Sequence, residues 1–232
     1  MRITAAVCTA ACLLLPHCLT GQAISGRIVL DSTGTPASRA VVVLIGDGAR
    51  IVAQTHADSG GIFGINTERP GAYRLGFFLG GRDALMSPSF VLDTGAYLER
   101  EYRLPASAAV AGEIWLPGEV TKTVLSRPGQ PMPEYPDAFG RLGRRGMVRL
   151  LFVVNEKGDP EMQTVQVIGA TDEAFIAPVL RALKRSRFWP AVRDGHPVAQ
   201  LTQRTFDFGC MGDPDSGDVI IRTLYPGACS KR

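Results

Sequence analysis

The chain has 232 residues and a formal net charge of +3, from 25 basic and 22 acidic side chains. Hydrophobic residues make up 45%, enough for a packed core in one or two modest domains, and the 20% of charged residues argues against wholesale disorder. The small net charge gives no sign of the clustered basic face that binding to nucleic acid requires, so we expect no nucleic-acid partner.

Residues 1–23 have the layout of a secretory signal peptide. Arg2 supplies the positive charge, the apolar run is densest at 13–15, and the small residues Gly21 and Ala23 stand where a signal peptidase cuts. The run is shorter than the roughly 20 apolar residues that span a membrane. We therefore expect an exported periplasmic protein, with an uncleaved leader that anchors it in the inner membrane as the alternative.

The cysteines agree with export. Cys8, Cys12 and Cys18 lie in the leader, so the mature chain keeps only Cys210 and Cys229. In an oxidising periplasm these two can form a disulfide, and two unrelated thiols are the alternative.

Residues 24–104 have an all-β pattern. Apolar or β-branched stretches such as Ala40–Ile45 and Tyr97–Leu104 alternate with turns such as Asp58–Gly61. No stretch shows the 3.6-residue periodicity of a long helix. Short strands separated by Gly, Pro and Asp turns favour a β-sandwich.

Four motifs in this region carry a family resemblance. They are Gly26–Val29, Ala40–Val43, Asp58–Phe63 and Pro70–Tyr73. In this order they resemble the carboxypeptidase regulatory-like domain, which implies a small seven-stranded sandwich with no catalytic activity of its own.

Residues 105–132 are predicted to be a linker. Four prolines and several glycines interrupt any regular pattern there. The tripeptide Ile114–Leu116 is apolar, so we expect part of the linker to pack on a neighbour.

Residues 133–209 predict a small domain that mixes strands with a helix. Val148–Val154 and Met162–Ile168 form a hairpin around a turn at Asn155–Gly158. Ala199–Phe208 supplies the last strand.

The helix of this domain lies between the second and the last strand. Thr171 or Asp172 is expected to cap it. Its apolar stripe consists of Phe175, Val179, Leu180 and Leu183. Cations crowd its end, where they favour the helix dipole; they are Arg181, Lys184, Arg185 and Arg187.

An ordered series of motifs in this domain resembles the TonB C-terminal domain. The motifs are Tyr135-Pro136, Gly146–Val148, Asn155–Gly158, Phe188–Ala191 and Gly195–Val198. The resemblance implies a two-layer α/β fold, with a three-stranded antiparallel sheet and the helix on one face. It also implies that Phe188 and Trp189 pack in the core.

The resemblance further implies how the domain binds. The last strand of such a domain takes up a short segment of an outer-membrane receptor, and an extended peptide can add to any free sheet edge. We expect Thr202, Arg204 and Asp207 on the exposed side of that strand, and Phe206 and Phe208 in the core. Tyr135, Arg181 and Lys184 complete the predicted partner-binding residues.

We expect no catalytic, metal or cofactor site, and hence no enzyme. The three histidines are His17, His56 and His196, and neither a His-Glu-x-x-His nor a Cys-x-x-Cys motif occurs. Asp58 and Ser59 near His56 are better explained by a β-turn, in which both residue types bind backbone groups.

Two features separate the chain from a full energy transducer: the leader resembles a cleavable signal, and the spacer is short. The predicted partners are therefore a TonB-dependent receptor segment, another envelope protein or peptidoglycan. The sequence leaves the oligomeric state open, a dimer included. In the tail, residues 210–232, we predict that Val219–Leu224 folds back as an extra strand beside Ala199–Phe208, held by a Cys210–Cys229 disulfide, and caps the binding edge.

Overall fold

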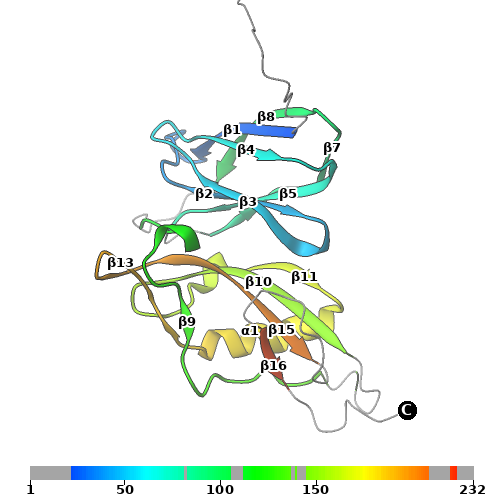
Figure 1. Ribbon diagram of the computed structural model, residues 1–232, viewed down its shortest axis with the longest axis vertical. Helices are drawn as coiled ribbons and strands as arrows, with labels where there is room; N and C mark the ends of the chain where they lie inside the picture. The colour runs from blue at the N-terminus through cyan, green and yellow to red at the C-terminus, as the bar shows by residue number, and fades with distance from the viewer. Residues whose placement is uncertain are drawn as a thin grey trace, which may run out of the picture.

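The computed structural model describes residues 22–80, 83–105, 112–136, 139, 145–208 and 220–223. Nearly all of the predicted leader, together with Cys210 and Cys229 and hence the predicted disulfide, lies outside these residues. Over these residues the fold is dominated by β-strands with one short α-helix (Figure 1), which confirms the predicted β-rich character. In the part that is described, no helix is long and apolar enough to cross a membrane.

The N-terminal half consists of two sheets packed face to face. The first has the order β4 (Ile62–Thr67), β1 (Gln22–Leu30), β8 (Tyr97–Leu104), with β1 antiparallel to β4 and parallel to β8. The second has the order β3 (Arg50–His56), β2 (Val41–Gly46), β5 (Gly71–Phe78), β6 (Leu85–Met86), and β7 (Phe90–Leu92) also pairs with β5. Side chains from both sheets form one core, among them Ile28, Phe63, Val42, Leu75 and Phe77.

Strand β2 is buried on both of its faces. Val42 and Leu44 point into the core between the two sheets. Val41, Val43 and Ile45 point the other way, yet each is at most 1% exposed. A run without polar alternation is typical of a strand with both faces covered, so a further layer must lie against this sheet.

That layer is the sheet of the C-terminal half. Its order is β11 (Gln166–Ala170), β10 (Gly146–Val154), β15 (Gln200–Phe208), β16 (Ile220–Thr223). β10 is antiparallel to both β11 and β15, and β16 runs parallel to β15. β16 lies within the tail for which an extra strand was predicted.

Helix α1 (Ile176–Arg185) covers one face of this sheet. Asp172 accepts a hydrogen bond from the backbone N–H of Ala174 at 3.0 Å and so caps the 3-10 turn Glu173–Phe175 that leads into the helix. The predicted apolar stripe is buried or half-buried against the sheet. Its sheet partners are Val148, Leu150, Phe152, Phe206 and Phe208.

The other face of the same sheet packs against the N-terminal half. Leu151 and Val153 of β10 join Leu201 of β15 in one apolar cluster with Val41 and Val43 of β2. From one end to the other, the layers are therefore the β4-β1-β8 sheet, the β3-β2-β5-β6 sheet, the C-terminal sheet and α1 (Figure 1). The two halves thus share a hydrophobic core.

Two arginines add polar contacts to this shared core. The Arg149 guanidinium on β10 donates to the carbonyl oxygens of Gly48 at 2.7 Å and Ala49 at 3.1 Å. Arg74 on β5 donates to the carbonyl oxygen of Ile168 on β11 at 2.9 Å. A hydrogen bond from a charged donor is stronger than a neutral one, so these contacts fix how the two halves sit on each other.

The segment predicted as a linker is bound to both halves over its described residues. Ile114 and Leu116 are buried in the shared core, and the 3-10 turn η2 (Pro117–Glu119) follows. Further on, the chain runs antiparallel to the segment after α1. The contacts there are a bridge between Lys122 and Val192 and the pairing of β9 (Leu125–Ser126) with β12 (Phe188–Trp189).

The remaining strands of the C-terminal half are the start of β11 and a small hairpin. β11 begins at Gln166 rather than at the predicted Met162, because Met162–Thr164 forms a 3-10 turn whose Thr164 hydroxyl accepts the N–H of Val153 at 2.9 Å. β13 (Ala191–Arg193) and β14 (His196–Val198) form a small hairpin.

Candidate functional site

The outer edge of β15, which faces away from β10, is the place where a partner strand was expected. The backbone N–H of Leu201 donates to the carbonyl oxygen of Trp115 at 3.1 Å, and the N–H of Trp115 donates to Ala199 at 2.9 Å. Because backbone groups alternate in direction along a strand, the odd-numbered residues of β15 direct theirs toward this edge.

Strand β16 covers the other end of that edge. Its register places Ile220 beside Thr205 and Thr223 beside Phe208. Between the two covered stretches lies Gln203, whose carbonyl oxygen accepts from the Arg204 guanidinium at 3.3 Å. A new strand therefore needs one of the covering segments to leave.

The structure corrects the predicted binding face of this strand. Thr202 and Arg204 were expected to be exposed, but they are 8% and 4% exposed. They have the same parity as Phe206 and Phe208, and side chains two residues apart lie on the same face of a strand. All four therefore lie on the side of the sheet that α1 covers, and only Asp207, which is half-buried, has the opposite parity.

Arg204 and Gln200 hold the segment that precedes β9. Arg204 donates to the carbonyl oxygen of Val124 at 3.1 Å, and the side-chain oxygen of Gln200 accepts the N–H of the same residue at 2.8 Å. Both residues are buried, so they have a structural role in fixing the chain across the sheet.

The remaining predicted binding residues lie apart from that edge. Tyr135 is half-buried, and its ring lies edge-on to Phe175 and Phe208 at centroid distances of 6.0 and 6.5 Å. Arg181 and Lys184 are exposed on α1, and Arg181 forms an ion pair with Glu134 at 3.4 Å. The structure therefore does not bring these residues together into one site.

Trp115 lies close to a cation from each half. The Arg193 guanidinium is 3.5 Å from the centroid of its ring, and that of Arg39 is 5.4 Å away. Arg39 also forms an ion pair with Glu113. Cation–π contacts of this kind add to the backbone bonds that hold Trp115 against β15.

Glu119 connects η2 to the N-terminal half. One carboxylate oxygen lies 2.9 Å from Nε2 of His56 and accepts the N–H of Leu116 at 2.8 Å. Burial raises the pKa of this carboxyl, but the hydrogen bonds from Leu116 and His56 and the charges of His56 and Arg39 together lower it below its ordinary value.

A second expectation was wrong. Trp189 was predicted to lie in the core, but its side chain is 53% exposed. Its neighbour Phe188 is buried, as strand alternation in β12 requires. The Arg127 guanidinium lies over the Trp189 ring, 4.3 Å from its centroid. The sequence motif alone could not show which of the two aromatic residues faces outward.

The histidine and carboxylate noted in the N-terminal half do not converge on a catalytic arrangement. The Asp58 carboxylate accepts the backbone N–H groups of Gly60 at 2.8 Å and Ile62 at 2.9 Å, which is turn chemistry. His56 is bound to Glu119 instead. Among the described residues, no group of three or more His, Cys, Asp or Glu side chains could hold a metal ion.

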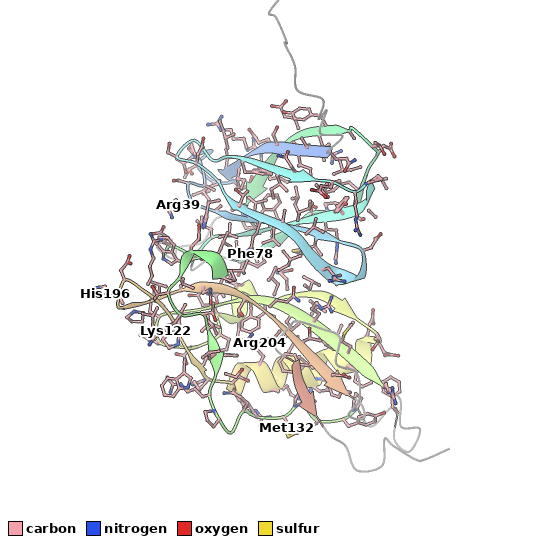
Figure 2. All side chains as sticks on the ribbon, in the orientation of Figure 1. Arg39, Phe78, Lys122, Met132, His196 and Arg204 are labelled. Carbon is pink, nitrogen blue, oxygen red and sulfur yellow. The ribbon has the colours of Figure 1, made fainter. Side chains whose placement is uncertain are left out.

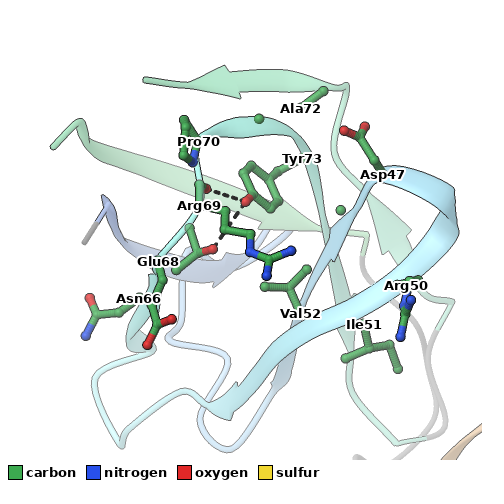
Figure 3. Close-up of a pocket in the computed structure, with 13 residues that line it drawn as sticks. Asp47, Arg50, Ile51, Val52, Asn66, Glu68, Arg69, Pro70, Ala72 and Tyr73 are labelled. Atoms are coloured by element: carbon green, nitrogen blue, oxygen red, sulfur yellow. Dashed lines mark hydrogen bonds between the residues drawn. The ribbon is translucent and has the colours of Figure 1, made fainter. Parts of the chain in front are cut away.

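A cavity of about 860 Å³ opens at one end of the N-terminal half (Figure 3). It lies between the β2–β3 and β4–β5 turns, and Asp47, Glu68 and Arg69 are among its lining residues. The Tyr73 hydroxyl donates to the carbonyl oxygen of Arg69 at 2.5 Å and lies 3.2 Å from the hydroxyl of Thr67. That hydroxyl therefore holds the β4–β5 turn in place.

Residues 131–210 match the family model of the Gram-negative bacterial TonB protein C-terminal. The match supports a TonB C-terminal domain in this part of the chain, as the motifs predicted. No curated protein sequence matches the chain.

Similar solved structures cover parts of the chain. The TonB C-terminal domain of Pseudomonas aeruginosa is 25% identical, over 39% of this chain and 89% of that one, with a TM-score of 0.31. The 5-hydroxyisourate hydrolase of Klebsiella pneumoniae is 17% identical, over 40% of this chain and 97% of that one, with a TM-score of 0.31. The pilus 2b backbone protein of group B streptococcus is 14% identical, over 37% of this chain and 41% of that one, with a TM-score of 0.33. At such TM-scores these likenesses carry no argument about function.

Proposed function

We propose that the chain is an exported, periplasmic, non-enzymatic TonB-like protein. In this proposal it docks an extended segment of an envelope partner as an added strand on the outer edge of β15. The observation that carries the proposal is that this edge already holds two extended segments of the chain itself, at Trp115 and at β16. Main-chain bonds to such an edge give affinity, and alternate side chains give specificity.

Strand β16 is the segment that a partner would replace. It has four residues and, among the described strands, pairs with β15 alone, in a parallel arrangement that is slightly less stable per residue than an antiparallel one. Trp115, by contrast, is also held by Arg39 and Arg193. β16 thus acts as a cap that competes with the partner for this edge.

The partner that best fits a TonB-like domain is a segment of an outer-membrane TonB-dependent receptor, which would link the protein to transport across the outer membrane. The N-terminal half, which we assign to the carboxypeptidase regulatory-like domains from its turn motifs, would hold the sheet from its other face. An anchored energy transducer is the alternative. The bound state of residues 112–132 supports docking, because a segment tied to both halves adds little reach.

Site-specific photo-crosslinking in the periplasm tests this proposal. A photoreactive phenylalanine analogue at Asp207, on β15, is expected to crosslink a receptor segment, and the same analogue at Arg100, exposed on β8, is not. Crosslinks from both positions alike, or only to cell-wall fragments, would contradict strand addition. N-terminal sequencing of the same protein separates the alternatives, because a start at Ile24 excludes the anchor.

A further inference from the structure

The two-stranded ribbon of β9 and β12 presents a pair of large apolar side chains that are more than half exposed. Leu125 and Trp189 lie directly opposite each other in the register. They are 55% and 53% exposed, although both are large and apolar. Opposed residues of a pair share one face, so the two side chains form a single apolar seat.

One cation lies directly over this seat, and two more precede β12 in the chain. Arg127 lies over the Trp189 ring, and Lys184 and Arg185 are exposed in the last turn of α1, just before β12 begins. Among the described residues, none of these three cations forms an ion pair. Arg187 adds a fourth positive charge and is paired with Asp159 at 3.1 Å. The local charge therefore favours an acidic partner.

Hydrogen bonds also fix the position of the side chains around Leu125 and Trp189. Nε of Arg127 donates to the carbonyl oxygen of Phe188 at 2.9 Å, which fixes the guanidinium above the tryptophan. The side-chain amide of Gln130 donates to the carbonyl oxygens of Arg127 and Arg187, and its oxygen accepts the N–H of Arg187 at 3.1 Å. Side chains that are already ordered lose less conformational entropy when a partner binds.

We propose that the ribbon face, defined as Leu125, Arg127, Trp189 and the neighbouring Lys184 and Arg185, binds an acidic peptide segment of a protein partner. An apolar side chain of the segment sits on Leu125 and Trp189, and its flanking carboxylates meet the cations. Tryptophan and arginine are the side chains that most often dominate the energy of such interfaces.

This surface is separate from strand addition at β15. The ribbon face uses side chains of β9, β12 and α1, whereas the outer edge of β15 uses backbone groups. The two proposals can therefore fail independently. Proline at Ile221 perturbs β16, which caps that edge, and is expected to leave binding at the ribbon face unchanged.

The test is fluorescence anisotropy of the full chain with a labelled peptide, Gly-Asp-Glu-Leu-Asp-Glu-Gly, and with a neutral form that carries Asn and Gln. We expect the acidic peptide to bind about tenfold more tightly than the neutral one, and the difference to shrink at high salt because ions screen exposed charges. Lys184→Glu and Trp189→Ser should each weaken binding of the acidic peptide about fivefold.

Matched controls lie on the N-terminal half, where Arg100 is an exposed cation and Val91 is 70% exposed. Arg100→Glu and Val91→Ser should bind the acidic peptide as the unaltered chain does. Equal binding of the acidic and neutral peptides overturns the proposal, as do controls that weaken binding as much as the test variants. Loss of binding to purified peptidoglycan in the test variants, without any peptide binding, also overturns it and assigns the surface to the cell wall.

Discussion

Gly158 shows what one position contributes to the hairpin between β10 and β11. Its φ is +85°, in the region that favours glycine, and an added Cβ would lie 2.1 Å from the carbonyl oxygen of Phe188. Asn155 completes the turn by accepting the N–H groups of Lys157 and Asp159, each at 3.0 Å. The turn therefore joins the hairpin to the start of β12.

We expect Gly158→Ala to destabilise the protein by about 3 kcal/mol, because it combines an unfavourable φ with a backbone clash. Gly195→Ala is the matched control, since its φ of +81° is similar and an added Cβ would meet nothing within 4 Å. The control should cost only about 1 kcal/mol in chemical denaturation. Equal costs for the two variants would show that the contact with Phe188 is unimportant.

The stability of the contact between η2 and the N-terminal half depends on pH through Glu119. Its pKa in the folded protein is lowered, so ionisation of this carboxylate stabilises the fold above its unfolded pKa of about 4.3. That stabilisation is lost as the pH falls through the folded-state pKa. Glu119→Gln should therefore cost about 0.5–1 kcal/mol at pH 7, after allowance for solvent screening, and less near pH 3.

Thermal denaturation of both proteins at pH 7 and pH 3 measures this difference. Glu134→Gln is the control, because Glu134 is exposed and its ion pair is with Arg181 on α1, in the C-terminal half. If Glu119→Gln costs the same at both pH values, the ionised carboxylate is not the source of the stabilisation.

Among the elements, the segment 112–132 shows most clearly what the sequence could not reveal. Its prolines and glycines predicted a linker, and only Ile114–Leu116 indicated packing. The structure places Ile114 at 1% exposure in the core that the two halves share. Such contacts join residues far apart in the chain, so the local pattern indicates that Ile114–Leu116 packs but not against which strands.

We expect Ile114→Ala to destabilise the whole protein by about 3 kcal/mol, because it leaves a cavity in a packed core. Leu125→Ala, in the same segment but 55% exposed, should cost less than about 0.5 kcal/mol. Urea denaturation compares the two. A mobile linker would tolerate both changes equally.

The elements with purely local signals were predicted well. The turn at Asn155–Gly158, the helix stripe and the Asp172 cap all depend on residues within a few positions of one another. By contrast, the burial of Thr202 and Arg204 depends on the segment around Val124 that crosses the same face of the sheet. Alternation along β15 places Thr202 and Arg204 on the same face as Phe206. Only the tertiary fold shows that this whole face is covered.

At the scale of the whole molecule, the two halves should unfold together because they share a core. Both tryptophans, Trp115 and Trp189, lie outside residues 22–105. Val43 lies on β2 and is fully buried against the C-terminal sheet. Tryptophan fluorescence therefore reports on the unfolding of the C-terminal half when the substitution is made at Val43, in the N-terminal half.

We expect Val43→Asp to cost more than about 3 kcal/mol, because it buries an unpaired carboxylate, and to lower the denaturation midpoint seen by tryptophan fluorescence. Val52→Asp on β3, where Val52 is 45% exposed, is the control and should leave that midpoint nearly unchanged. An unchanged midpoint in Val43→Asp would mean that the halves unfold independently.

The overall view of the side chains shows the same arrangement: labelled Phe78 lies between the halves, Arg204 lies within the C-terminal half, and His196 and Met132 lie at its periphery (Figure 2). With the helix on one face of the C-terminal sheet and the N-terminal half on the other, docking onto this sheet is confined to its edges. On the outer edge of β15, the short strand β16 is the part that can be exchanged most readily.

Hydrogen exchange at the backbone amides of Thr205 and Asp207 tests strand addition most directly. Ile221→Pro removes a donor from β16, so these amides should exchange faster than in the unaltered chain. A synthetic peptide with the sequence of residues 218–225, added to that variant, should restore their protection, and a scrambled peptide should not. If the proline leaves their exchange unchanged, or the peptide restores nothing, the outer edge of β15 is not a site that takes up an extended segment.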